Sequence, residues 1–318
     1  MKRLAISFTL LAATLFLTAA QCNKTPQTDP EENDPEVTDP EPEKDPEPLN
    51  ECTLSIMSFN VAVDKLAPVT GWGDRKKAVI NMLSQVKPMV IGFQEAQAHE
   101  ITDMKNAHPE YDWYGLGRET AKRPEYTTEY SAEETMAVFW LKDSLSVVES
   151  GTFWLSQNPD KPGLGWDAKY PRTLTWVHFI HKKSKLQFFM FNTHLDNKGK
   201  TARTESMKLI ANKMTELNPD GYLAFLTADF NTNSNDAIFA PIKGTMKSTR
   251  DVAPDSDKTK MTLNNYTAPK SQIDHIFYLD IKNVEPLTFR VYDQDFGNTW
   301  ISDHYPVMGT FLYKRVTE

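Results

Sequence analysis

Short runs of apolar residues, each bounded by polar or turn-forming residues, recur along the chain from residue 52 onward. The runs are rich in β-branched and aromatic side chains and are shorter than a typical helix, so each of them predicts a β-strand. The predicted strands cover residues 52–63, 88–93, 136–141, 174–180, 186–192, 222–227, 273–279 and 307–313.

Apolar residues recur at three- and four-residue intervals in two further segments, 75–86 and 201–217. This spacing places them on one face of an α-helix. Many strands with few helices between them, and no internal repeat, indicate an α+β architecture and not a regular βαβ series. We interpret residues 52–318 as one folded domain.

The first twenty residues have a different pattern. Lys2 and Arg3 precede a mainly apolar run from residue 4 to residue 20, which is typical of a secretory signal peptide. The run is at the short limit for a membrane span, and no other stretch of the sequence is apolar enough to cross a bilayer. We therefore expect the protein to be exported.

Residues 23–51 are dominated by proline, aspartate and glutamate. Proline removes a backbone donor, like charges repel, and almost no apolar side chain can be buried, so this tract predicts a disordered, extended linker. Residues 29–51 hold eleven acidic residues and one lysine, which accounts for most of the formal net charge of −8. The domain itself is nearly neutral, without the overall basic charge typical of proteins that grip long duplexes.

The chain has two cysteines, Cys22 and Cys52. Cys22 directly follows the apolar run, in the segment LTAAQC, which resembles a bacterial lipoprotein signal. On that hypothesis residues 1–22 are the signal, and a lipid on Cys22 anchors the protein to a membrane of a bacterial envelope. Ordinary cleavage after Ala20, a Cys22–Cys52 disulfide in an oxidising compartment, and a free, buried Cys52 at the start of the domain are the alternatives.

Clusters of polar residues stand at the ends of several predicted strands. A single polar residue there usually begins a turn, but six clusters rich in carboxylates, imidazoles and amides indicate a shared function. The clusters are Asn60, Gln94-Glu95, Asn192-Thr193-His194, Asp229-Phe230-Asn231, Asp274-His275 and Ser302-Asp303-His304.

Hydrolysis of a phosphoester needs this set of groups. Carboxylate and amide oxygens hold the hard cation that neutralises phosphate charge, a carboxylate positions water, and imidazoles stabilise developing charge. On an extended segment, side chains two residues apart face the same way. We therefore expect Asp229 and Asn231 to reach one phosphate while Phe230 packs behind them.

The order of these clusters resembles the endonuclease/exonuclease/phosphatase superfamily, to which deoxyribonuclease-I-like enzymes belong. The resemblance covers about residues 54–313 and includes Glu134, which precedes the strand at 136–141. It also includes residues 150–156, a stretch common in secreted bacterial members. It implies a four-layer sandwich of two mixed β-sheets flanked by helices, and a requirement for Mg²⁺ or Mn²⁺.

The resemblance also implies a role for each site residue. Glu95 is a metal ligand, and Asn60 and Asp303 complete or support the metal site. Asp229 orients or deprotonates the attacking water, and Asn231 holds the scissile phosphate. His194 and His304 contact phosphate oxygens, with Asp274 as hydrogen-bond partner of His304 and Glu134 as that of His194.

Two features outside the clusters affect the interpretation. Arg172 could clamp a phosphate through its planar guanidinium, or it could belong to a structural ion pair. Some nucleases of this superfamily have a second acid two residues after the first asparagine. This chain has Ala62 there, which weakens the case for two metal ions.

We therefore expect a metal-dependent phosphoester hydrolase, namely a phosphodiesterase, nuclease or phosphatase, that acts outside the cytoplasm by in-line attack of water on phosphorus. Nucleic acid, sugar phosphate and lipid phosphate remain open as substrates, as does the oligomeric state. A binding protein that has the fold but lacks catalysis is the alternative.

Overall fold

The computed structural model describes residues 47–65 and 69–315. These residues belong to one compact unit that begins at Glu47. The proposed signal peptide, Cys22 and the acidic linker up to residue 46 lie outside the described residues. Among the residues described, no helix is both long enough and apolar enough to span a bilayer.

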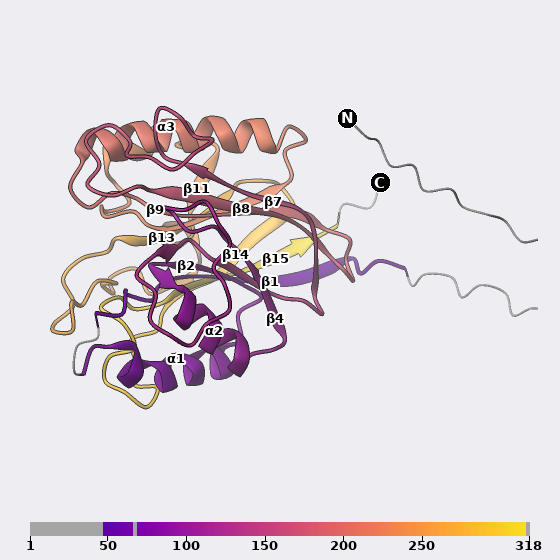
Figure 1. The fold of residues 1–318 in the computed structure, drawn as a ribbon. Coiled ribbons are helices and arrows are strands. Elements are labelled where there is room, and N and C mark those ends of the chain that lie inside the picture. Colours follow the sequence, from indigo (N-terminus) through magenta and orange to yellow (C-terminus); the bar gives the residue numbers. More distant parts are fainter. Residues whose placement is uncertain (1–46, 66–68, 316–318) are drawn as a thin grey trace, which may run out of the picture. The chain divides into compact units, whose positions relative to one another are not determined.

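Two mixed β-sheets lie face to face, with helices on both outer sides (Figure 1). The larger sheet contains, in spatial order, β12 (Asp255–Ser256), β14 (Val284–Val291), β15 (Val307–Lys314), β1 (Glu51–Asn60), β2 (Val90–Gln94), β6 (Val138–Leu141) and β4 (Tyr111–Tyr114). The smaller contains β11 (Met246–Ser248), β13 (Asp274–Leu279), β10 (Leu223–Asp229), β9 (Gln187–His194), β8 (Thr173–His181) and β7 (Leu145–Trp154). A separate short pair consists of β3 (Ala96–Gln97) and β5 (Glu134–Thr135).

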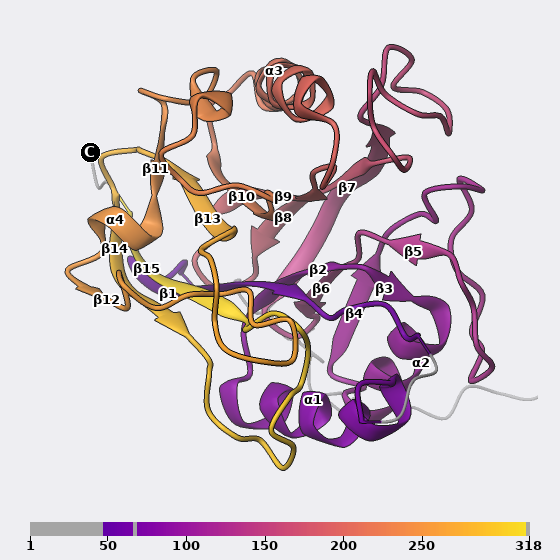
Figure 2. The same ribbon diagram turned by 90° about the vertical axis from the view of Figure 1, so that its left-hand side faces the viewer.

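The helices complete the outer layers. They are α1 (Trp72–Val86), α2 (Ala98–Ala107), α3 (Lys200–Leu217) and the single turn α4 (Thr249–Val252), with one 3₁₀ turn at Ala237–Phe239. The helix α3 covers the outer face of the smaller sheet, and α1 and α2 cover that of the larger one (Figure 2). The predicted four-layer α+β sandwich is therefore confirmed.

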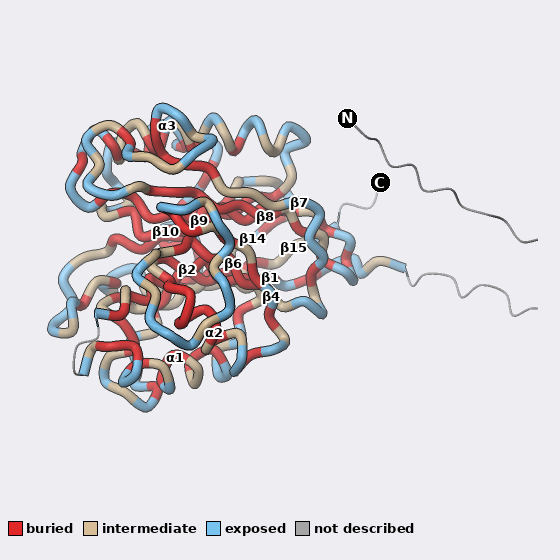
Figure 3. The backbone as a smooth tube through the Cα atoms, viewed as in Figure 1, coloured by how far each residue is buried: buried red, intermediate tan, exposed pale blue. Residues whose placement is uncertain are grey.

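Alternating side chains of the central strands build three core layers. In β1, Leu54 and Ile56 pack between the two sheets, whereas Phe59 packs beneath α1. In β9, Phe188 lies between the sheets and Phe191 faces α3. Successive side chains of a strand point to opposite faces, so strands buried on both sides carry apolar residues at nearly every position. The buried segments accordingly run through both sheets (Figure 3).

The strand register gathers the polar clusters at one edge. The strands β1 and β2 are parallel and pair Asn60 with Gln94, while the parallel strands β9 and β10 pair His194 with Asp229. The antiparallel strand β13 places Asp274 opposite Asp229. Both sheets therefore end in polar residues on the same side of the molecule.

Candidate active site

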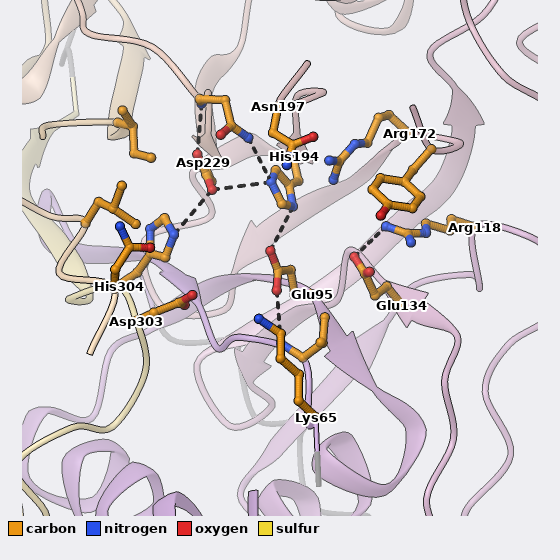
Figure 4. Close-up of a pocket in the computed structure, with 16 residues that line it drawn as sticks. Lys65, Glu95, Arg118, Glu134, Arg172, His194, Asn197, Asp229, Asp303 and His304 are labelled. Atoms are coloured by element: carbon orange, nitrogen blue, oxygen red, sulfur yellow. Dashed lines mark hydrogen bonds and ion pairs between the residues drawn. The ribbon is translucent and has the colours of Figure 1, made fainter. Parts of the chain in front are cut away.

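A pocket of about 390 Å³ opens at this edge (Figure 4). Two of the ten predicted site residues, Asn60 and Asp274, are buried behind its wall and contact residues that form it. The other eight line the pocket, namely Glu95, Glu134, Arg172, His194, Asp229, Asn231, Asp303 and His304. The fold thus brings together residues that are spread over most of the domain sequence.

Asp229 lies at the centre of the group. Its Oδ2 atom is 3.3 Å from Nε2 of His194 and 3.6 Å from Nε2 of His304. Burial raises the pKa of Asp229 to about 7, although the charge of His304 opposes the shift. A carboxyl group with this pKa can accept a proton near neutral pH, as a general base must.

His304 and Asp274 form a buried ion pair. Nδ1 of His304 lies 2.8 Å from Oδ2 of Asp274, the contact that the family resemblance implies. Burial alone would lower the pKa of His304, but the charges of Asp274 and Asp229 raise it to about 10. His304 is therefore a cation at neutral pH, with Nδ1–H donating to Asp274 and Nε2 facing Asp229.

His194 is the neutral imidazole of the site. Burial, together with the charge of Arg172, holds its pKa well below the usual range. Within the described part of the chain, its Nδ1 has no hydrogen-bond partner, and it lies 3.8 Å from Oε1 of Glu95.

The expected pairing of Glu134 with His194 is wrong. Glu134 belongs to the separate strand pair β3–β5, which directs it to the far wall of the pocket. There its Oε2 accepts a hydrogen bond of 2.5 Å from Nη1 of Arg118. The nearest carboxylate to Nδ1 of His194 is instead that of Glu95.

Asn231 reaches the pocket through a turn and not along an extended strand. The strand β10 ends at Asp229, and Asn231 has a φ of +53°, in the left-handed region. Its backbone N–H donates to Oδ1 of Asp229 at 2.8 Å, and its Nδ2 lies 3.0 Å from Nε2 of His194. Phe230 packs in the core beneath α3, so the expected convergence is present but arises from a different backbone geometry.

Asn60 connects two of the carboxylates. Its Nδ2 donates to Oε1 of Glu95 at 3.2 Å and to Oδ2 of Asp229 at 3.1 Å, while its Oδ1 accepts the N–H of Ala62 at 3.0 Å. The other oxygen of Glu95 accepts the N–H of Val63 at 2.9 Å. Asn60 therefore orients Glu95 and Asp229 in this conformation, and its Oδ1 keeps a second lone pair that could serve a cation.

The carboxylates that face the pocket suit a hard cation. Glu95 and Asp303 both line it. Burial raises the pKa of Asp303, and the negative charge of Glu95 adds to that increase, as it does for Asp229. Repulsion among oxygen donors is relieved by a dication, and Mg²⁺ and similar ions prefer such ligands. The donor set therefore fits the metal that the family resemblance implies.

A second group of potential ligands lies beside the first. Asp229, Asp274 and His304 offer ligand atoms that all lie within 4.8 Å of one another. Two of these residues are already joined by the hydrogen bond between Asp274 and His304. The site thus contains two neighbouring sets of residues that could hold a metal ion, Glu95 with Asp303, and Asp229 with Asp274 and His304.

The wall opposite His304 is cationic, and the sequence indicated only part of it. Arg172 pairs with Asp196, with 3.5 Å between Nε and Oδ2, and it also lines the pocket, where its contact with a phosphate stays a prediction. The ring of Tyr170 lies 5.1 Å from Cζ of Arg118 and 5.8 Å from Cζ of Arg172. Arg118 stands in a loop without a periodic pattern, and its partner Glu134 is remote in sequence, so no sequence signal marks it.

Comparisons with a family model and with solved structures show which proteins this chain resembles. The chain matches the model of the Endonuclease/Exonuclease/phosphatase family over residues 57–304. A family protein of Bacteroides thetaiotaomicron is 31% identical, with a TM-score of 0.74, over 83% of this chain and 99% of that one. A mannosyl-6-phosphatase of Bacteroides thetaiotaomicron VPI-5482 is 32% identical, with a TM-score of 0.72, over 81% of this chain and 99% of that one.

A protein of Acanthamoeba polyphaga mimivirus, L388, is 24% identical over 261 residues, which are 76% of this chain and 92% of that protein. The family match includes every predicted site residue from Asn60 to His304. Strand order, site geometry and sequence similarity agree, and the chain belongs to the endonuclease/exonuclease/phosphatase family.

Proposed function

We propose that this protein is a metal-dependent phosphoester hydrolase that acts on small phosphate esters outside the cytoplasm. The observation that carries the proposal is the position of Asp229, whose Oδ2 faces both imidazoles, 3.3 Å from His194 and 3.6 Å from His304. A base between two imidazoles, beside carboxylates that suit a cation, is the arrangement that in-line attack of water on phosphorus requires.

In this mechanism Asp229 orients the attacking water and accepts its proton. The Nδ2 of Asn60 holds Oδ2 at 3.1 Å, and the N–H of Asn231 holds Oδ1 at 2.8 Å. The carboxylate therefore has one defined orientation before substrate arrives. Such preorganisation lowers the barrier because the reacting groups need not search for their geometry.

The imidazoles and Asn231 would contact the phosphate. Protonated His304 would donate from Nε2 and place positive charge where negative charge develops in the transition state. Asp274 keeps that imidazole charged and in one orientation through the 2.8 Å bond to Nδ1. Asn231, whose Nδ2 lies beside His194, would hold a non-bridging oxygen.

Glu95 and Asp303 would hold the divalent cation, Mg²⁺ or Mn²⁺, with Asn60 supporting Glu95. When bound, the cation supplies charge neutralisation at the phosphate. The neighbouring group of Asp229, Asp274 and His304 suits a cation less well. The pKa of His304 is raised to about 10, so it would have to lose a proton and its bond to Asp274 to become a ligand.

Two observations favour a small phosphomonoester of the sugar-phosphate kind. A pocket of about 390 Å³ is within the range of small-molecule sites and is lined by groups that would enclose one phosphate. The mannosyl-6-phosphatase that is 32% identical supports the same substrate class. The nearly neutral domain has no overall basic charge that would favour a long nucleic acid.

The proposed location rests on the sequence before residue 47. The signal-like run, Cys22 and the acidic linker together favour a lipoprotein held at a membrane of the bacterial envelope. A pocket for small soluble esters suits an enzyme that faces the medium.

A substrate panel tests the proposed function. The purified protein would be assayed with mannose 6-phosphate, other sugar phosphates, an aryl phosphodiester, duplex DNA and a phospholipid, each with Mg²⁺, Mn²⁺ or a chelator. We expect metal-dependent turnover that is fastest with a sugar phosphate. A preference for DNA would correct the substrate class, and the absence of any turnover would favour the non-catalytic alternative.

A further inference from the structure

The segment after His194 has no role in the chemistry above, yet it contains a buried carboxylate that bridges two parts of the pocket wall. Asp196 is 2% exposed, and its Oδ2 accepts the backbone N–H groups of Lys169 at 3.0 Å and Tyr170 at 3.3 Å. These two residues belong to the loop 167–172, which supplies Tyr170 and Arg172 to the pocket.

The other oxygen of the same carboxylate faces α3. Oδ1 of Asp196 accepts the N–H groups of Lys198 at 3.0 Å and Gly199 at 2.8 Å, immediately before that helix begins. One side chain therefore ties the loop 167–172 to the start of α3 through four hydrogen bonds from the backbone.

Asp196 also touches the arginine of that loop, with 3.5 Å between its Oδ2 and Nε of Arg172. Arg172 is 5% exposed, and its Nε and Nη1 atoms find no hydrogen-bond partner among residues 47–65 and 69–315. Burying a guanidinium whose N–H donors lack acceptors costs free energy, and a bound anion that accepts from these donors would remove that cost. Its planar group is turned toward His194 and the interior of the pocket (Figure 4).

We propose that Asp196 is a positioning residue for anionic substrate, because it fixes both the backbone that carries Arg172 and the guanidinium itself. Asp196 acts through Arg172, whose Nε faces Asp196 and whose Nη1 would donate to the phosphate of the ester. The inference rests on the proposed function and adds to that site a residue that none of its polar clusters includes. Its effect is on substrate affinity and not on the chemical step.

The chain offers a matched control in Asp167. Its carboxylate oxygens accept the N–H groups of Ala202 at 2.6 Å and Thr201 at 3.2 Å, so it also ties the loop 167–172 to α3. Asp167 is exposed and has no contact with Arg172 among the described residues. Removing its carboxylate loosens the same connection without reaching the guanidinium.

Steady-state kinetics on the best phosphoester of the panel test the proposal. Asp196→Asn is expected to raise KM about 10- to 100-fold, the effect of losing a charged hydrogen-bonded contact, and to change kcat by less than about threefold. Asp167→Asn is expected to change KM by less than about threefold. The double variant Asp196→Asn/Arg172→Ala is expected to be no worse than Arg172→Ala alone, because the two residues act as one unit.

A second measurement is independent of turnover. Binding of inorganic phosphate in the presence of Mg²⁺, followed by calorimetry, is expected to weaken in Asp196→Asn and not in Asp167→Asn. If the wild type binds phosphate but hydrolyses no ester of the panel, the proposed function fails while the phosphate affinities still decide the role of Asp196.

Three outcomes would overturn the proposal. They are additive effects in the double variant, equal effects of the Asp167 and Asp196 substitutions, and a wild type without affinity for phosphate. Asp196→Glu covers the case in which the asparagine variant does not fold, since glutamate keeps the charge but displaces the carboxylate from Arg172. If Asp196→Glu had the same KM and phosphate affinity as the wild type, that result would also contradict the proposed role of Asp196.

Discussion

Asn60 and Asp229 come from different sheets, and Nδ2 of Asn60 donates to Oδ2 of Asp229 at 3.1 Å. A second contact joins the sheets nearby, where Nε2 of Gln94 donates to Oδ1 of Asn192 at 2.7 Å. The active site is therefore assembled across the interface of the two sheets. Its geometry depends on how closely they approach, so changes at this interface are expected to affect both stability and activity.

Gly92 on β2 is the most direct test of that dependence. A Cβ atom there would lie 2.4 Å from Oδ1 of Asn192 and 2.4 Å from Oγ1 of Thr227, both on the other sheet. Gly92→Ala is expected to lower the free energy of unfolding by about 1–3 kcal/mol, as overpacking does, and to reduce kcat. Gly163→Ala is the matched control in urea denaturation, because its Cβ would meet nothing within 4 Å. Equal stability of the two variants would mean that the sheets can separate without cost.

Asp229 and His304 are expected to act mainly in the transition state. Asp229→Asn and His304→Ala should each lower kcat by roughly 10²–10⁴ and change KM much less, because general-base and electrostatic contributions have this size. Melting temperatures measured on the same preparations separate this loss from unfolding. Folded variants that turn over substrate at near wild-type rates would contradict the catalytic assignment.

The pair of His304 and Asp274 predicts a change in pH dependence. The charge of Asp274 contributes to raising the pKa of His304 to about 10, so Asp274→Asn lowers that pKa. If the protonated imidazole is the active form, activity is present below its pKa and is lost as the pH rises through it. The alkaline limb of the kcat–pH profile should therefore move to lower pH in Asp274→Asn. An unmoved limb would separate His304 from the group that titrates there.

The two neighbouring sets of potential metal ligands give different expectations for metal binding. Glu95→Gln keeps the shape of the side chain but removes its charge, so affinity for Mn²⁺ and turnover at limiting Mn²⁺ should fall together. Asp274→Asn should weaken Mn²⁺ binding less. Calorimetric titration of both variants with Mn²⁺ measures the two affinities. A larger loss of affinity in Asp274→Asn than in Glu95→Gln would place the cation at Asp229, Asp274 and His304.

The anchor hypothesis concerns residues outside the described structure. Wild-type protein expressed in a bacterium should partition with membranes, and Cys22→Ala should be released or processed differently, because the cysteine would carry the lipid. Intact mass spectrometry of the mature protein provides the direct measurement. A wild type that is freely soluble and has no added lipid mass would exclude lipidation.

The strands with unbroken apolar patterns were predictable, and the two longest strands that were missed, β7 and β14, have irregularities that interrupt the pattern. In β7 the register shifts between Val147 and Glu149, and Val147 is exposed on an edge strand. In β14 the register shifts between Pro286 and Thr288. Each shift interrupts the alternation of apolar and polar positions that identifies a strand. The helix α2 is short, and its capping box begins with Gln97 instead of the more usual serine or threonine.

In the site, residues marked by the local sequence pattern were predicted, whereas a residue placed by contacts between distant segments was not. Residues such as Asp229 and His304 stand directly at strand ends, where the local pattern marks them. Arg118 lies in the pocket wall beside Glu134 and Tyr170, and these contacts depend on how three separate segments pack together. The role expected for Glu134 was wrong for the same reason, since its neighbours are set by the small β3–β5 pair.

The direction of β1 determines at which end of the domain the preceding residues are attached. Asn60 ends the strand at the pocket, whereas Glu51 begins it beside Lys314. Its ten residues, at about 3.3 Å each, separate these ends by roughly 30 Å. An attachment made through the residues before Glu47 therefore joins the domain at the end remote from the catalytic groups.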